Sequence, residues 1–128
     1  MLGSIHNIMK VIIAGSRTFD DYHYLSIMCD RIFGIKDDIE IVSGGAKGAD
    51  SLGERYARER NLPLTIFPAE WDKYGKSAGY KRNSQMADYS HMLIAFWDGK
   101  SKGTQHMINL AEKKGLMVEV YNPFEIDY

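Results

Sequence analysis

The sequence predicts a doubly wound α/β domain, with a five-stranded, mainly parallel sheet and helices on both faces. Short and almost entirely apolar segments alternate with segments in which apolar residues recur at helical spacing. The apolar segments lack the polar alternation of a half-exposed strand, which indicates a sheet covered on both faces. Right-handed crossovers between parallel strands then give the strand order 3-2-1-4-5.

In chain order, the first strand is expected at residues 9–14, an aliphatic run that ends at a glycine. A helix over 21–33 follows, because its apolar residues form one stripe before a terminating glycine. Residues 39–42 are β-branched or acidic and predict the second strand. Residues 49–60 predict a helix whose outer face carries the ion pairs Glu54–Arg58 and Arg55–Glu59.

The second half of the chain continues this alternation. Residues 69–76 have no clear period and are expected to form an irregular aromatic loop. Thr104 suits the N-cap of the last helix, which ends before a glycine. The other predicted elements are strands at 64–67, 92–97 and 117–121 and helices at 77–88 and 104–114.

Length and charge limit the classes of function. With 128 residues the chain has room for one domain, which we place at 9–128 after a leader or cloning remnant at 1–8. Its 16 basic and 17 acidic residues give a net charge of −1, which argues against binding nucleic acid or membranes through bulk charge and allows a local basic patch. No apolar run approaches the roughly 18–20 residues of a membrane span.

Cysteine and histidine usage points to a cytoplasmic protein without a metal or other cofactor. The single cysteine, Cys29, excludes an intrachain disulfide and lies on an apolar helical stripe, so we expect a buried structural thiol. The four histidines have no metal-ligand spacing. We expect His91 to be structural and His106 to be exposed on its helix.

Glycine-rich turns follow the three strands that flank the expected reversal of winding, at residues 15–17, 43–50 and 98–104. Ligands of doubly wound sheets bind at this place. Glycines let the backbone approach a ligand, and the free N–H groups of a helix start favour an anion. The alternative is that these turns merely pack helices onto the sheet. Ser43 stands where a dinucleotide fingerprint has its first glycine, so that motif is incomplete.

A basic and aromatic segment spans residues 71–85, between the second and third of these turns. Its cations Lys73, Lys76, Lys81 and Arg82 are interleaved with Trp71, Tyr74 and Tyr80. Aromatic rings that stack bases and cations that meet phosphates are typical of nucleotide or single-strand binding. A solvated helix face with packed aromatics is the alternative.

These segments together resemble the SLOG superfamily, specifically its YspA-like branch, over residues 9–121. The motifs that carry the resemblance are Gly15-Ser16-Arg17, residues 43–50, Trp71 with residues 75–79, Arg82-Asn83 with Met86, and residues 95–104. The resemblance implies a Rossmann-like fold and a nucleotide-derived ligand. Relatives implied by it include the "lonely guy" phosphoribohydrolases and the DNA-processing protein A family, which binds single-stranded DNA.

The resemblance to the phosphoribohydrolases is incomplete. Arg82 lies four residues before Met86 and matches their catalytic arginine, but Met107 stands at the position of their essential glutamate. If this chain cleaves an N-glycosidic bond, another acid must act, and Asp50 and Asp98 are the candidates by position.

We therefore expect a binding module for a nucleotide-derived small molecule, in a possible homodimer. The alternatives are a nucleotide N-glycosidase that uses Arg82 with Asp50 or Asp98, and a single-stranded nucleic-acid binder. Gly44, Gly45, Gly48 and Thr104 would cradle phosphate, Arg17 and Arg82 supply charge, Asp50 hold a ribose hydroxyl and Trp71 stack the base. The remaining expected ligand contacts are Gly15, Ser16, Ser43, Lys47, Ala49, Asn83, Asp98, Ser101 and Gly103.

Overall fold

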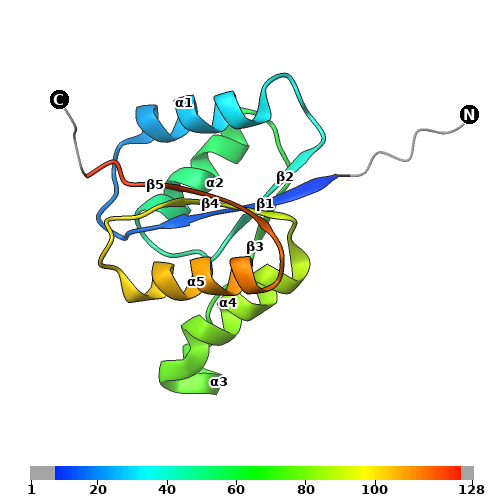
Figure 1. The fold of residues 1–128 in the computed structure, drawn as a ribbon. Helices are drawn as coiled ribbons and strands as arrows, with labels where there is room; N and C mark the ends of the chain where they lie inside the picture. The colour runs from blue at the N-terminus through cyan, green and yellow to red at the C-terminus, as the bar shows by residue number, and fades with distance from the viewer. Residues whose placement is uncertain (1–7, 125–128) are drawn as a thin grey trace, which may run out of the picture.

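A computed structural model describes residues 8–124 as a five-stranded sheet in which every paired strand is parallel (Figure 1). The order is β3-β2-β1-β4-β5, which confirms the predicted topology. Of the expected leader at 1–8, all but residue 8 lie outside the described residues. The strands are β1 (Met9–Gly15), β2 (Ile39–Ser43), β3 (Leu64–Ile66), β4 (Met92–Phe96) and β5 (Met117–Tyr121).

Helices cover both faces of the sheet. The helices α1 (Tyr22–Phe33) and α2 (Ala49–Glu59) lie on one face, and α4 (Ala78–Tyr89) and α5 (Lys102–Lys113) lie on the other (Figure 1). The expectation of an irregular loop at 69–76 was wrong for most of its length. This segment contains the four-residue helix α3 (Trp71–Tyr74) and begins the 3-10 turn η1 (Gly75–Ser77), and both are too short to leave a period in the sequence.

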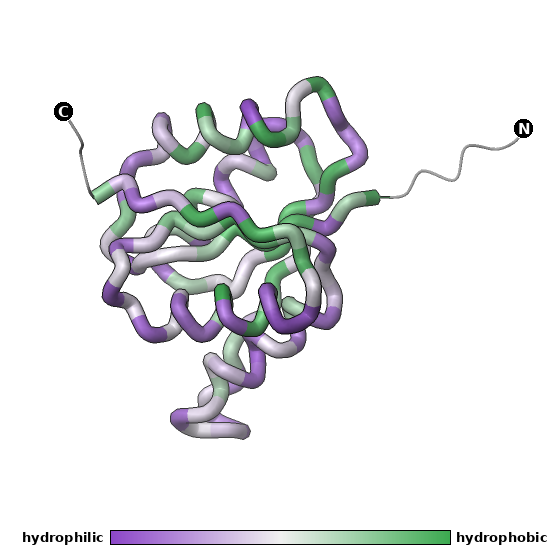
Figure 2. The backbone as a smooth tube through the Cα atoms, viewed as in Figure 1, coloured by the Kyte–Doolittle hydropathy of each residue, from purple (hydrophilic) through white to green (hydrophobic). Residues whose placement is uncertain are grey.

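The core consists of two apolar layers separated by the sheet. Along β1, Val11 and Ile13 face α1 and α2, whereas Ile12 and Ala14 face α4 and α5. Because both faces of the sheet are buried, polar and apolar residues need not alternate along the central strands. These strands consist mainly of hydrophobic residues (Figure 2). Cys29 is fully buried, as predicted, and burial raises the pKa of its thiol to about 12.

The helix ends follow the expected chemistry with one exception. The carboxylate of Asp21 accepts a hydrogen bond from the backbone N–H of Tyr24 at 3.0 Å and caps α1. Thr104 was expected to cap the last helix, but α5 begins earlier and its N-cap is Ser101. Thr104 is instead buried in the first turn of α5, with its hydroxyl 3.2 Å from that of Ser101.

Within residues 8–124, no helix combines the length and apolarity needed to cross a membrane. Both predicted ion pairs on the outer face of α2 are present. The Arg55–Glu59 pair has an N–O distance of 2.9 Å, and the Arg58–Glu54 pair has one of 3.7 Å.

Candidate functional site

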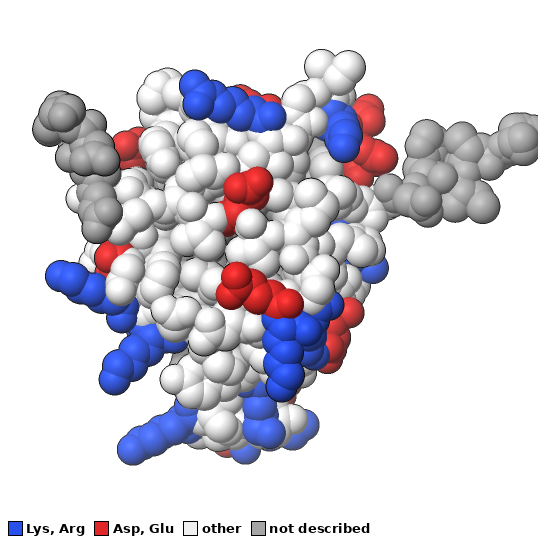
Figure 3. Space-filling view, viewed as in Figure 1, with Lys and Arg blue, Asp and Glu red and all other residues white. Residues whose placement is uncertain are grey.

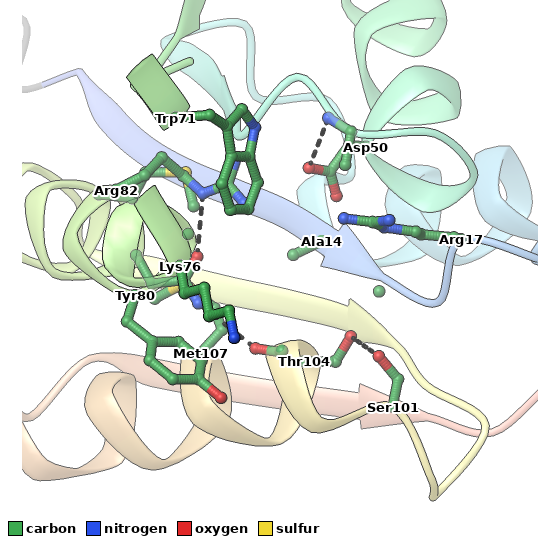
Figure 4. A pocket seen from close by; sticks show the side chains of 16 residues that line it. Ala14, Arg17, Asp50, Trp71, Lys76, Tyr80, Arg82, Ser101, Thr104 and Met107 are labelled. Atoms are coloured by element: carbon green, nitrogen blue, oxygen red, sulfur yellow. Dashed lines mark hydrogen bonds between the residues drawn. The ribbon is translucent and has the colours of Figure 1, made fainter. Parts of the chain in front are cut away.

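Two adjacent cavities lie at the carboxyl ends of β1 and β2, and the first of them borders the start of α5. The first, which we call the first chamber, has a volume of about 240 Å³ and is drawn in Figure 4. Side chains from the β1 loop, α2, α4 and α5 converge on it. Its lining consists of Ala14, Gly15, Arg17, Ala46, Asp50, Trp71, Lys76, Gly79, Tyr80, Arg82, Asn83, Met86, Ser101, Gly103, Thr104 and Met107.

The second chamber has a volume of about 540 Å³ and lies beside the first. Four residues, Arg17, Ala46, Trp71 and Arg82, line both chambers, so the cavities share a wall that carries two arginines. The rest of the second chamber comes from the loop after β2, from α2 and from the end of β3. These residues are Gly44, Gly45, Lys47, Glu54, Ile66, Pro68 and Ala69.

Ser16 forms hydrogen bonds that link the loops after β1, β2 and β4, which surround the site. Its backbone N–H donates to the carbonyl of Phe96 at 2.9 Å, and its own carbonyl accepts from Ala49 N–H at 3.2 Å. Its side-chain oxygen accepts from the backbone N–H of Asp98 at 3.0 Å. Ser16 is 1% exposed and lines neither chamber, so its role is to hold the loops in place.

Two glycines allow these loops to approach one another. A Cβ on Gly15 would lie 2.1 Å from the carbonyl oxygen of Phe96, so only glycine permits this spacing of β1 and β4. Gly48, with φ of 77°, would place a Cβ 2.3 Å from the carbonyl oxygen of Ser16. Gly48 therefore packs against the β1 loop and lines neither chamber.

Arg82 reaches from α4 to the loop after β2. Its Nη1 donates a hydrogen bond to the carbonyl of Gly44, and its Nε donates to Oδ1 of Asn83 at 3.1 Å. A Cβ on Gly44 would lie 2.7 Å from Arg82 Nη1 and 2.9 Å from Oδ2 of Asp50, so a larger residue would require one of these side chains to shift. Burial lowers the pKa of Arg82, while Asp50 opposes this effect.

Asp50 lies in the first turn of α2 and is only 6% exposed. Burial raises the pKa of its carboxyl to about 6, against the lowering effects of the Ala46 N–H and of Arg82. The Ala46 N–H donates to Oδ2 of Asp50 at 3.2 Å. The positive end of the α2 dipole, where a ligand anion could bind, is therefore already occupied by the side chain of Asp50.

The start of α5 offers a more open place for an anion. Gly103 and Thr104 lie in its first turn and line the first chamber, and nothing described lies within 4 Å of a Cβ built on Gly103. The positive end of the helix dipole therefore faces the cavity. Asp98 lines neither chamber. Its Oδ1 accepts N–H bonds from Lys100 and Ser101, both at 2.8 Å, and these bonds lower its pKa.

Aromatic residues lie at the opening of the site. Trp71 is 52% exposed and Tyr80 is 49% exposed, although both line the first chamber. The Tyr80 ring packs against His106 at a tilt of 32°, with centroids 4.2 Å apart. The Nδ1 atom of His106 lies 3.1 Å from the side-chain amide of Asn83, so His106 is partly buried and the expectation of an exposed histidine was wrong.

Several positively charged side chains lie in and near the first chamber. Figure 3 shows Lys and Arg side chains over α3 and near the start of α5. Lys73 and Lys81 lie over the ring of Tyr74, at 5.0 and 4.9 Å from its centroid. Lys76 lines the first chamber together with Arg17 and Arg82. Among the described residues, no group of three or more His, Cys, Asp or Glu side chains is arranged to hold a metal ion.

The structure brings most of the predicted site residues together. Those that line a chamber are Gly15, Arg17, Gly44, Gly45, Lys47, Asp50, Trp71, Arg82, Asn83, Ser101, Gly103 and Thr104. Those that line neither are Ser16, Ser43, Gly48, Ala49 and Asp98. Ser43 is fully buried, and its hydroxyl donates to Glu54 at 2.7 Å.

Several lining residues were not predicted. Lys76 and Tyr80 belong to the basic and aromatic segment, which was the signal for them, but the sequence did not indicate which of its residues point inward. Ile66 is 42% exposed at the end of β3, and the sequence carried no signal that it lines a cavity. Met86 and Met107 form part of the floor as members of the core.

Comparison with known proteins identifies related sequences. The model of the "YspA, cpYpsA-related SLOG family" matches residues 9–74. The Gene 61 protein of Mycobacterium phage D29 is 33% identical over 116 residues, which cover 85% of this chain and 93% of that protein. The predicted resemblance to the SLOG superfamily is therefore confirmed.

Solved structures of DNA processing protein A (DprA) share the fold. The Streptococcus pneumoniae protein aligns with a TM-score of 0.72 at 20% identity, over 90% of this chain and 50% of that chain. The Helicobacter pylori protein, whose structure concerns its binding of single-stranded DNA, aligns with a TM-score of 0.71 at 21% identity, over 94% and 69% of the two chains. This chain thus spans half of the S. pneumoniae protein.

Proposed function

Since the chain belongs to the YspA, cpYpsA-related SLOG family, we propose that its strand-end site binds nucleotides through their phosphates, and that the ligand is single-stranded DNA. One observation carries this proposal: Arg17, Arg82 and the start of α5 border the same chamber as the exposed rings of Trp71 and Tyr80. Guanidinium groups and helix starts bind phosphate, and exposed aromatic rings stack bases.

Two further observations favour a strand over a free nucleotide. The cations extend beyond the chambers to Lys73 and Lys81, where they can meet phosphates outside the cavity. The H. pylori DprA structure, which shares this fold, concerns the binding of single-stranded DNA. A similarity at 21% identity supports a shared fold and does not by itself support a shared ligand. The proposal that this chain binds DNA therefore rests mainly on its own basic and aromatic surface.

A free nucleotide-derived ligand is the second candidate. The first chamber is a recess with an apolar floor that includes Met86 and Met107, which suits a small ligand better than an open groove would. The net charge of −1 also argues against a protein that binds many phosphates along a nucleic-acid strand. Both candidates use the same phosphate-binding groups and differ in whether the ligand continues out of the site.

Fluorescence anisotropy separates the two candidates. A labelled 12-nucleotide oligothymidylate is titrated with the protein, and unlabelled oligothymidylate, duplex DNA and thymidine monophosphate serve as competitors. We expect the single strand to bind and to be displaced by unlabelled single strand, with far weaker displacement by duplex or by the mononucleotide.

The double variant Arg17→Ala/Arg82→Ala tests the location of binding. Arg31→Ala is its matched control, since Arg31 is exposed in the last turn of α1 and lines neither chamber. We expect loss of binding in the double variant and unchanged binding in the control. Equal affinity of the double variant and the control would contradict the proposed site. Displacement by mononucleotide as effective as by oligonucleotide would favour the free nucleotide.

A further inference from the structure

We propose that the two chambers receive two consecutive nucleosides of one strand, with the phosphodiester that joins them held at the shared wall by Arg17 and Arg82. This inference rests on the proposed function and adds to it the length of the smallest complete ligand. It predicts that a dinucleotide occupies the site fully and that a mononucleotide fills only half of it.

The shared wall has the charge that a bridging phosphate requires. Arg17 and Arg82 line both chambers, so a phosphate at the divide faces both guanidinium groups. Arg82 is fixed in this place because its Nη1 donates to Gly44, which lines the second chamber, and its Nε donates to Asn83, which lines the first. Among the described residues, Nη2 of Arg82 has no hydrogen-bond partner, which leaves a donor for the phosphate.

The second chamber has the chemistry of a nucleoside site. Ile66, Pro68 and Ala69 give it an apolar side against which a base can lie. Glu54 supplies a carboxylate to the same cavity, and this group already accepts from the Ser43 hydroxyl at 2.7 Å. A carboxylate repels phosphate and accepts hydrogen bonds from base or sugar donors. The phosphate therefore stays at the arginine wall, and the uncharged part of the nucleotide enters the chamber.

The first chamber suits one further unit. Ala14, Met86 and Met107 make its floor apolar, while Asn83 and Thr104 supply polar groups. Its volume of about 240 Å³ is smaller than that of the second chamber, about 540 Å³, and lies below the range of about 300–1,000 Å³ typical of complete small-molecule sites. A ligand of two linked nucleosides uses both spaces, and the start of α5 then faces the phosphate on the other side of the first nucleoside.

A ladder of 5′-phosphorylated oligothymidylates of one to four nucleotides tests this inference by calorimetry. We expect affinity to rise by at least about fivefold from one nucleotide to two, since one stacked base contributes about 1–3 kcal/mol. Each addition beyond two nucleotides is expected to raise affinity by less than this first step, because it meets only cations outside the chambers, such as Lys73 and Lys81. Equal affinity for one and two nucleotides, or a uniform increase through four, would overturn the two-chamber assignment. Absence of binding by every member would instead refute the proposed function.

The variant Ile66→Glu probes the second chamber alone. Ile66 lines only that chamber and is 42% exposed, so the substitution adds a charge without removing a core residue. We expect about a tenfold weaker binding of the dinucleotide and unchanged binding of the mononucleotide. Ile35→Glu, at a fully exposed position remote from the chambers, is the matched control and should bind both ligands as the parent does. Equal weakening of both ligands by Ile66→Glu, or no effect on either, would contradict the inference.

Discussion

Arg82 on α4 donates a hydrogen bond from its Nη1 to the backbone carbonyl of Gly44 in the loop after β2. The contact joins two elements that are 38 residues apart and fixes a cation between the two chambers. Glycine at position 44 gives the guanidinium room in this position, since a Cβ there would lie 2.7 Å from Nη1 and require the Arg82 side chain to shift. The arginine thus lies where it can bind phosphate because the glycine-rich loop leaves room for it.

Removal of the Arg82 guanidinium is expected to weaken binding of single-stranded DNA. A hydrogen bond to a charged group contributes about 1.5–3 kcal/mol, so Arg82→Ala should raise Kd by about 10- to 150-fold. Arg82→Lys should recover only part of this loss, because lysine lacks the separate donors that meet Gly44 and the ligand. Anisotropy titration measures both variants. A change in Kd of less than about twofold for Arg82→Ala, within the range of surface substitutions, would mean that Arg82 does not contact the ligand.

Asp50 is expected to make stability depend on pH. Burial raises the folded-state pKa of its carboxyl from 3.8 to about 6, so the folded state binds this proton more tightly than the unfolded state does. The free energy of unfolding contributed by Asp50 therefore falls as pH rises from 4 through 6. Asp50→Asn should stabilise the protein by up to about 3 kcal/mol at pH 8 and by little at pH 4.

Urea unfolding followed by tryptophan fluorescence measures this difference at pH 4, 6 and 8. The control is Asp72→Asn, because Asp72 is exposed in α3. Asp72→Asn should change stability little at every pH. A gain for Asp50→Asn that is equal at pH 4 and pH 8 would show that the pKa of Asp50 is not raised by folding.

Gly48 and Gly103 are expected to respond oppositely to alanine. At Gly48 the backbone has φ of 77° and a Cβ would lie 2.3 Å from the carbonyl oxygen of Ser16, whereas at Gly103 a Cβ meets nothing described within 4 Å. Gly48→Ala should therefore lower the free energy of unfolding by about 1–3 kcal/mol. Gly103→Ala should leave it unchanged or raise it by up to about 1 kcal/mol. Thermal unfolding compares the two, and equal stability would refute the packing role of Gly48.

The protein is expected not to release the base from adenosine monophosphate. The phosphoribohydrolases that the sequence resembles place a glutamate at the position of Met107, but Met107 is 1% exposed in the apolar core. Asp98 lines neither chamber and is bonded to its own loop, and Asp50 accepts from Ala46 and packs against Gly44. Chromatography of free adenine measures turnover. Hydrolysis that Asp50→Asn abolishes would assign catalysis to Asp50 and contradict a purely binding role.

The fold was largely predictable because burial on both faces leaves a simple pattern in the sequence. The central strands face helices on each side, so their apolar runs and their order followed from periodicity and handedness. The helix α3 was not predicted, since four residues are too few to show a period. The sequence predicted Thr104 as the N-cap of α5, and the structure has Ser101 there. Serine and threonine are both favoured at N-caps, so the residue type alone could not show at which of the two the helix begins.

The site was predictable in position and only partly in composition. Topology placed Arg17 and Asp50 at the strand ends, the family resemblance pointed to Arg82, and all three line the first chamber. The sequence could not distinguish glycines that face the cavity from Gly48, which packs on a neighbouring loop. It also could not indicate that Ile66 borders a second cavity, because that depends on how the end of β3 lies beside the loop after β2.

The most direct test of the binding site is a nitrogen–proton correlation spectrum of the labelled protein during titration with oligothymidylate. The glycine amides report on both ends of the sheet in one experiment. Gly15, Gly44, Gly45 and Gly103 line the chambers, whereas Gly34 and Gly115 follow the carboxyl ends of α1 and α5, at the opposite end of the strands. We expect the first four signals to shift and saturate together, while those of Gly34 and Gly115 stay in place. Shifts confined to Gly34 and Gly115, or a spectrum unchanged by the oligonucleotide, would contradict binding at the strand ends.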